Sequence, residues 1–163
     1  MLYMMCAARR MGRAFTLVEV MVTVAVIGIL LLIAIPVFGK ARNSAVAGDI
    51  VNDLRTFYGA FQQFNNDLGG YPPVKADGSL DARMAGYLDM KCWEGGPGGG
   101  GHYKWLRYEP VNELVIYIAG GPGIETMQLV DERLDDGNLT SAALRQATAS
   151  DCFYILDWGD SIP

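Results

Sequence analysis

The chain has 163 residues, with 13 basic and 18 acidic side chains and a formal net charge of −5 at pH 7. This length accommodates one modest domain beside a membrane segment. The acidic balance disfavours nucleic-acid binding by bulk charge, because phosphate backbones would repel the chain. No nucleic-acid partner is therefore expected.

A long apolar run follows a short basic leader that contains three arginines. Val20 to Gly39 are 20 consecutive uncharged residues, and Lys40 ends the run. As an α-helix, this run would be about 30 Å long, which matches the hydrocarbon core of a bilayer. A secretory signal peptide has an apolar region of only about 7–15 residues and a small-residue cleavage site after it. The run predicts a single membrane-spanning helix with the leader on the cytoplasmic side.

One carboxylate, that of Glu19, stands at the start of this run. A charge at the centre of a span costs about 2.5–3.5 kcal/mol, and less near the interface. In one interpretation, Glu19 reaches the headgroups and gains about 0.3–1 kcal/mol from the helix dipole. In the other, Glu19 awaits a positive partner. Cleavage between Ala14 and Phe15 would create an α-amino group one helical turn away, able to meet Glu19 of a neighbouring copy.

The segment FTLVE at residues 15–19, followed by a long aliphatic helix with Gly28 and Pro36, resembles the amino-terminal motif of type IV pilins and type II secretion pseudopilins. The resemblance implies that a prepilin peptidase cuts between Ala14 and Phe15 and methylates the new amino terminus. It also implies that the residue 19 carboxylate docks subunits into a helical filament.

One position departs from the family pattern. The family usually has Gly immediately before the cut, whereas this chain has Ala14 there and Gly12 two residues earlier. Alanine is small enough for a pocket built for glycine. A cut after Gly12 would leave Arg13 in the mature chain and move Glu19 out of register, so the cut is expected after Ala14.

Gly28 and Pro36 weaken the apolar helix. Pro36 lacks a backbone donor and crowds the carbonyl of Leu32. One interpretation is a tolerated kink, since membrane helices often contain Gly and Pro. The resemblance implies another, in which this segment unwinds locally when subunits enter the filament.

An amphipathic helix is predicted for residues 40–68, continuing the apolar run. Its apolar residues recur at spacings of three and four, as on one face of a helix that packs on a core. Gly69-Gly70 and the following Tyr71-Pro72-Pro73 supply the stop. The apolar stripe comprises Ala47, Ile50, Leu54, Phe57, Phe61, Phe64 and Leu68.

The head, residues 69–163, carries strand signals at 102–108, 114–119 and 152–158, rich in aromatic and β-branched residues. Residues 109–113 read as a hairpin-like connection between the first two. Residues 124–134 predict a helix, 141–146 a further helical turn and 80–88 a small helix. The expected fold class is α+β and pilin-like: a long N-terminal helix packed on a small antiparallel sheet.

Two glycine-rich stretches, residues 95–101 and 120–123, lack the Gly-Lys-Ser/Thr ending of a P-loop and are expected to be loops. His102 is the only histidine of the chain, and no serine partner for it is evident. Catalysis is therefore not expected.

An acidic turn around Asp131, Asp135, Asp136 and Asn138 offers oxygen ligands for calcium. Its spacing does not match an EF-hand, and a helix end followed by an Asp-Gly turn explains it adequately. The resemblance keeps calcium open, because heads of the major type II pseudopilin bind it. No other cofactor is expected.

The cysteines suggest one disulfide. Cys6 would leave with the leader, so Cys92 and Cys152 form an even pair in a head that faces an oxidising compartment. A bridge between them would contribute about 3–4 kcal/mol by restricting the unfolded chain. The alternative is two separate thiols.

The expected organisation is a cleaved leader (1–14), a membrane and polymerisation helix (15–39), an amphipathic helix (40–68) and a periplasmic head (69–163). The resemblance implies a protein of the bacterial inner membrane that is extracted from the lipid into a filament. Its implied partners are copies of itself, other pseudopilins, the prepilin peptidase and an inner-membrane assembly platform.

Three functions remain open. The first is a subunit of a type II secretion-like pseudopilus that helps to export proteins, favoured by the short head and the early stop after the helix. The second is a type IV pilin for adhesion, motility or DNA uptake. The third is a single-pass membrane protein with a ligand-binding head, which leaves Glu19 unexplained.

Overall fold

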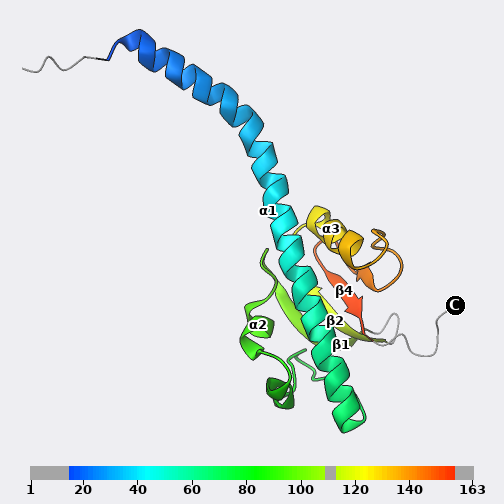
Figure 1. The fold of residues 1–163 in the computed structure, drawn as a ribbon. Helices are drawn as coiled ribbons and strands as arrows, with labels where there is room; N and C mark the ends of the chain where they lie inside the picture. Colours follow the sequence, from blue (N-terminus) through cyan, green and yellow to red (C-terminus); the bar gives the residue numbers. More distant parts are fainter. Residues whose placement is uncertain (1–14, 109–112, 157–163) are drawn as a thin grey trace, which may run out of the picture. The chain divides into compact units, whose positions relative to one another are not determined.

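The computed structural model describes residues 15–108 and 113–156, which fold into helices and a small sheet (Figure 1). The chain forms two compact units, one up to Gly39 and one from Lys40 on. The elements in chain order are α1 (Leu17–Leu68), the 3-10 helix η1 (Ala82–Gly86), α2 (Met90–Gly95), β1 (His102–Tyr108), β2 (Glu113–Ala119), α3 (Ile124–Leu134), β3 (Leu144–Gln146) and β4 (Cys152–Ile155).

The sheet of the second unit has four strands in the order β1-β2-β4-β3, and every neighbouring pair is antiparallel. Trp105 of β1 pairs with Ile116 of β2, which in turn pairs with Tyr154 of β4. A long N-terminal helix packed on a small antiparallel sheet is the predicted pilin-like α+β fold, which is thus confirmed.

The core lies between α1 and the sheet and is rich in aromatic rings. Phe57 and Phe61 of α1 are fully buried, as is Trp105 of β1. The ring centroids of Phe61 and Trp105 lie 4.4 Å apart, and those of Phe57 and Tyr103 lie 4.9 Å apart at 84°. Such contacts add about 0.5–1.5 kcal/mol to the burial itself. The predicted stripe therefore faces the sheet from Ala47 to Phe64, whereas Leu68, its last predicted member, is 54% exposed at the end of the helix.

α1 ends where the glycine pair predicts. Gly69 has φ +72, a left-handed conformation that residues with a Cβ rarely adopt, and its N–H donates to the carbonyl of Asn65 at 2.8 Å. This is the αL cap that commonly ends helices.

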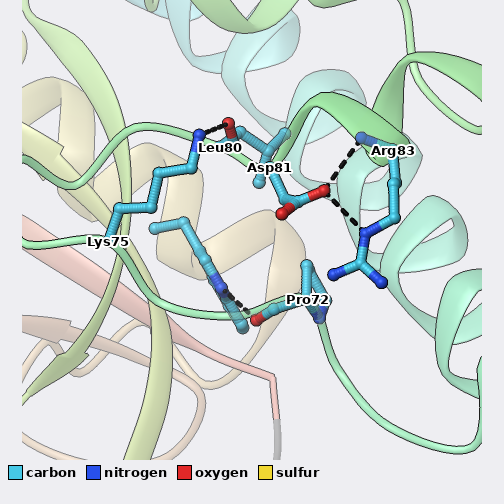
Figure 2. A network of polar contacts seen from close by, with 6 residues as sticks. Pro72, Lys75, Leu80, Asp81 and Arg83 are labelled. Atoms are coloured by element: carbon cyan, nitrogen blue, oxygen red, sulfur yellow. Dashed lines mark hydrogen bonds and ion pairs between the residues drawn. The ribbon is translucent and has the colours of Figure 1, made fainter.

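The connection after α1 is tied to the first strand (Figure 2). The indole Nε1 of Trp105 donates to the carbonyl of Pro72 at 2.9 Å, and its backbone N–H donates to the carbonyl of Gly78 at 2.9 Å. Asp81 caps η1 by accepting from the N–H of Arg83, and its Oδ1 also bonds the Arg83 guanidinium. The two Trp105 bonds hold the segment against β1, and the Asp81 bonds fix the start of η1.

The glycine-rich loops serve close packing. A Cβ on Gly99 would lie 2.6 Å from Cβ of Pro122 and 2.9 Å from Cγ1 of Val46. One on Gly101, which has φ +100, would lie 2.6 Å from the carbonyl oxygen of Ala119. The two loops thus pack on each other, and the loop at residues 95–101 also packs on α1. Side chains at Gly99 and Gly101 would prevent these close approaches.

Several predicted elements of the head are confirmed: strands 102–108 and 114–119 are β1 and β2, and helix 124–134 is α3. The predicted helix at 80–88 is the shorter η1. The helical turn predicted at 141–146 is wrong, because Leu144–Gln146 form β3, paired with β4. α2 was not predicted. The strand predicted at 152–158 ends at Ile155, and its last two residues lie outside the described ranges, as does most of the 109–113 connection.

Candidate functional site

The first unit exposes a continuous apolar surface. The most apolar 18-residue window of α1 has a mean hydropathy of 3.0, and none of it is buried. Leu17, Leu32 and Phe38 are each about three-quarters exposed, at 75%, 76% and 74%. By length and composition, α1 is able to cross a membrane. This surface has to be covered by lipid or by other apolar helices, because water would make its exposure costly.

Thr16 and Glu19 form a reciprocal cap at the start of α1. The backbone N–H of Thr16 donates to Oε2 of Glu19 at 2.9 Å, and the hydroxyl of Thr16 donates to the same oxygen at 2.8 Å. In return, the N–H of Glu19 donates to the Thr16 hydroxyl at 3.2 Å. With Leu17 as the first helical residue, Thr16 stands at the N-cap and Glu19 at N3, the positions of a capping box.

This cap gives the carboxylate a partner before any second chain arrives. The first N–H groups of a helix have no partner inside the helix, and an apolar solvent supplies none. Glu19 satisfies one of them, and its negative charge lies at the positive end of the helix dipole. Both bonds use Oε2, so Oε1 accepts no hydrogen bond from the part of the chain that the structure describes.

The role of Thr16 was missed by the sequence analysis, although the signal was present. A threonine followed three residues later by a glutamate is the pattern of a capping box. Phe15, immediately before Thr16, is 78% exposed, so the carboxyl-side residue of the expected cleavage site is accessible. Ala14, on the other side of that bond, lies outside the described residues.

Gly28 and Pro36 both lie inside α1, which continues through them without a break. A Cβ at Gly28 would meet nothing within 4 Å, so packing inside this chain does not require a glycine there. Local unwinding during assembly stays a prediction.

The predicted Cys92–Cys152 disulfide is absent from the structure, which has both cysteines as free thiols. The Sγ of Cys92 donates to Oδ1 of Asp53 at 3.4 Å, and Oδ2 of the same carboxylate accepts from the Tyr103 hydroxyl at 2.9 Å. Asp53 of α1 therefore holds α2 through Cys92 and β1 through Tyr103. Cys152 is buried in β4 and pairs with Gln146 and Ile118 in the sheet.

Burial makes both thiols poor nucleophiles. It raises the pKa of Cys92, with the nearby Asp53 carboxylate adding to the effect, and it raises the pKa of Cys152 to about 12. We expect two titratable thiols in the denatured, unreduced mature chain and slow alkylation of both in the folded chain. Thiol titration in denaturant checks the first expectation, and the finding of no free thiol there would restore the disulfide.

The acidic turn uses its oxygens internally. Asp135 Oδ2 accepts from the N–H of Ala143 at 2.6 Å, and Asp136 Oδ1 accepts from the N–H of Asn138 at 2.8 Å. Within residues 15–108 and 113–156, no group of three or more His, Cys, Asp or Glu side chains has an arrangement that would hold a metal ion. The turn therefore does not fit a calcium site.

Asp131 differs from its neighbours in this turn. Its side chain is completely buried, and neither carboxylate oxygen has a hydrogen-bond partner. Desolvation, followed by the charges of Asp135 and Asp136, raises its pKa to about 6.

Comparison with known proteins finds similarity to a family model and to solved structures. Residues 9–35 match the family model described as the prokaryotic N-terminal methylation motif. Among solved structures, the fold is similar to that of the major type IV pilin PilA1 from Clostridium difficile, with a TM-score of 0.53 and 17% sequence identity. That match covers 71% of this chain and 97% of the pilin chain. No curated protein sequence is similar enough to count as a match.

The two comparisons bear on different parts of the chain. The motif match includes Ala14, Phe15, Glu19 and Gly28, and ends one residue before Pro36. The structural match, at its low identity, establishes the fold alone. Neither comparison chooses between the kinds of filament that the sequence analysis left open.

Proposed function

We propose that this type IV pilin-like chain is the precursor of a filament subunit, cut between Ala14 and Phe15 and assembled through Glu19. The observation that carries the proposal is the capped carboxylate at the start of an exposed apolar helix. Type IV pilins are structural proteins and not enzymes, in agreement with the expectation of no catalysis. In this organisation residues 1–14 are the leader, 15–39 the membrane and polymerisation helix, 40–68 the amphipathic helix and 69–163 the head.

The cap gives the Glu19 carboxylate a hydrogen-bond partner before assembly and leaves one of its oxygens for a partner in the filament. In the membrane, Oε2 of Glu19 is held by Thr16, so the charge does not stand alone in lipid. Removal of the leader creates an α-amino group on Phe15. In a bundle of these helices, that amine meets Glu19 of a neighbouring copy, where Oε1 has room for a donor. Each charge neutralises the other in an apolar environment, where an unpaired charge would cost about 3 kcal/mol.

Within this class, a pseudopilus of a type II secretion-like machine is the favoured assembly. The short head and the early stop at Gly69 support it, and the acidic composition makes direct DNA contact by the head less favourable. A type IV pilus is the alternative. In either case the precursor is a single-pass inner-membrane protein with a periplasmic head. Its partners are other copies, related subunits, the peptidase, the assembly platform and membrane lipid.

Processing provides the first test. Co-expression with an active prepilin peptidase is expected to give a membrane-extracted chain whose first residue is Phe15, with a methyl group on its amine. Amino-terminal sequencing and mass spectrometry measure both features, and a catalytically inactive peptidase is the control. A mature chain that begins at any other residue would contradict the proposal.

The choice of machine needs a second experiment. Deletion of the gene from its source bacterium is expected to remove specific proteins from the culture medium and to leave surface filaments intact. Loss of surface filaments with unchanged secretion would instead favour the type IV pilus.

A further inference from the structure

We propose that Asp131 is a proton-binding group of the head, whose protonated form favours the docking of α3 and whose ionisation loosens the last turn of α3 and the loop that follows. The proposal goes beyond filament assembly and does not depend on it. It concerns the acidic turn that does not fit a calcium site, and it proposes that this turn binds a proton, on Asp131.

The fold buries the Asp131 carboxyl group where neither water nor a hydrogen-bond donor stabilises its ionised form. Asp131 has 0% exposure, and both Oδ1 and Oδ2 lack a hydrogen-bond partner. It stands four residues after the buried Met127 and next to the buried Val130, so it lies on the face of α3 that packs inward. A buried carboxylate without partners is strongly disfavoured, whereas the neutral acid loses much less on burial.

The charges around Asp131 also oppose its ionisation. The charges of Asp135 and Asp136 in the turn raise its pKa, and that of Glu132 beside it on α3 adds a lesser effect. The backbone N–H of Asn138, which donates to Asp136, lowers it. From β4, the facing group is the buried thiol of Cys152, which is neutral. Desolvation is the largest cause and brings the pKa to about 6.

The position of Asp131 couples its proton to the docking of α3. Two residues further on, Arg133 donates from Nη1 to the carbonyl of Ser44 at 2.9 Å and from Nη2 to the Ser44 hydroxyl at 2.7 Å. In return, Nη2 of Arg55 donates to the carbonyl of Arg133 at 3.3 Å. These bonds fasten the last turn of α3 to α1. A charge on Asp131 would draw water into this interface and weaken it.

The sign of the pH dependence follows from the raised pKa. In the unfolded chain the carboxyl ionises near its ordinary value of 3.8, and in the folded chain near 6. The group therefore contributes stability that is full below about pH 4 and is lost as pH rises through about 6. Between those limits the folding equilibrium constant should fall by about 100-fold because of this one group.

The test compares the full mature chain in detergent micelles with Asp131→Asn, which keeps the shape but cannot ionise. Urea unfolding from pH 4 to pH 7.5 should show the wild-type folding constant falling by about 100-fold relative to the variant. Hydrogen exchange at residues 131–143 should quicken more steeply in the wild type than in Asp131→Asn, since the base-catalysed rise with pH is common to both. Glu132→Gln removes an equal charge from an exposed neighbour and should leave most of the pH dependence intact.

Three outcomes would overturn the proposal. The first is a wild-type pH dependence equal to that of Asp131→Asn. The second is stabilisation of the wild type, and not of the variant, by added calcium at pH 7.5, which would make the turn a cation site. The third applies even if the variant does not fold: a carbon-13 NMR titration of the wild-type Asp131 carboxyl with a midpoint at or below about 4.

Discussion

Replacing Glu19 by alanine is expected to abolish filament formation while leaving the chain folded and cleaved. The variant loses the partner of the Phe15 amine, which then enters an apolar bundle uncompensated. Removal of one member of a buried ion pair costs about 3–5 kcal/mol, or more than 100-fold in each subunit contact. Because a subunit makes such a contact each time it is added, the loss accumulates along the polymer. Filaments recovered by shearing and sedimentation give the yield.

A matched variant separates the inter-subunit role of the carboxylate from its role in the helix cap. Thr16→Ala removes the hydroxyl that bonds Glu19 but keeps the charge, so it loses a cap that contributes about 0.5–2 kcal/mol. We expect it to assemble less well than the wild type and far better than Glu19→Ala. Normal incorporation of Glu19→Ala subunits into filaments would show that charge pairing is not needed.

The second large effect is expected in the core, where Phe61→Ala should destabilise the folded chain by about 3–5 kcal/mol. Phe61 has no exposed surface, and its ring lies 4.4 Å from that of Trp105 and 6.0 Å from that of Trp93 between centroids. The truncation leaves a cavity that rigid neighbouring rings fill poorly. Urea unfolding of the full chain in micelles, followed by tryptophan fluorescence, measures the loss.

Tyr58→Ala is the control for this truncation. Tyr58 is an aromatic residue of the same helix, three positions away, but it is 41% exposed. Its replacement should cost much less, on the order of 1 kcal/mol. Similar losses for the two variants would mean that the aromatic stripe is not the contact that holds α1 to the sheet.

The long elements were predictable because the residue pattern typical of each one recurs along its length. The stripe of α1 recurs over many turns and stops at Gly69, whose left-handed conformation marks the end of the helix. β1 and β2 have seven residues each, rich in β-branched and aromatic side chains. The three-residue β3 has no period to detect, and its partner β4 is supplied by a later part of the chain. α2, with six residues, is marked only by its Asp89 cap.

Glu19 stands out in the sequence as a charge in an apolar run. Its contact with Thr16 also has a sequence signal, the capping-box spacing, but the bonds themselves are visible only in the structure. The disulfide was predicted from the even number of cysteines in the mature chain, and that number says nothing about the distance between the two thiols. The prediction could not foresee that Cys92 bonds Asp53 while Cys152 lies within the sheet.

Asp131 shows a further limit of sequence reasoning. In the sequence, a cluster of acidic residues at a helix end is typical of a solvent-exposed turn. Its spacing of four residues from Met127 places it on the inward face of α3, but its complete burial is visible only in the packed structure.

A high-resolution structure of the purified, assembled filament tests the charge pairing itself. Each Glu19 carboxylate is expected to lie within hydrogen-bonding distance of the Phe15 amine of a neighbouring subunit. A filament in which Glu19 is still bonded only to Thr16 of its own chain, with no amine from another subunit beside it, would rule out the pairing.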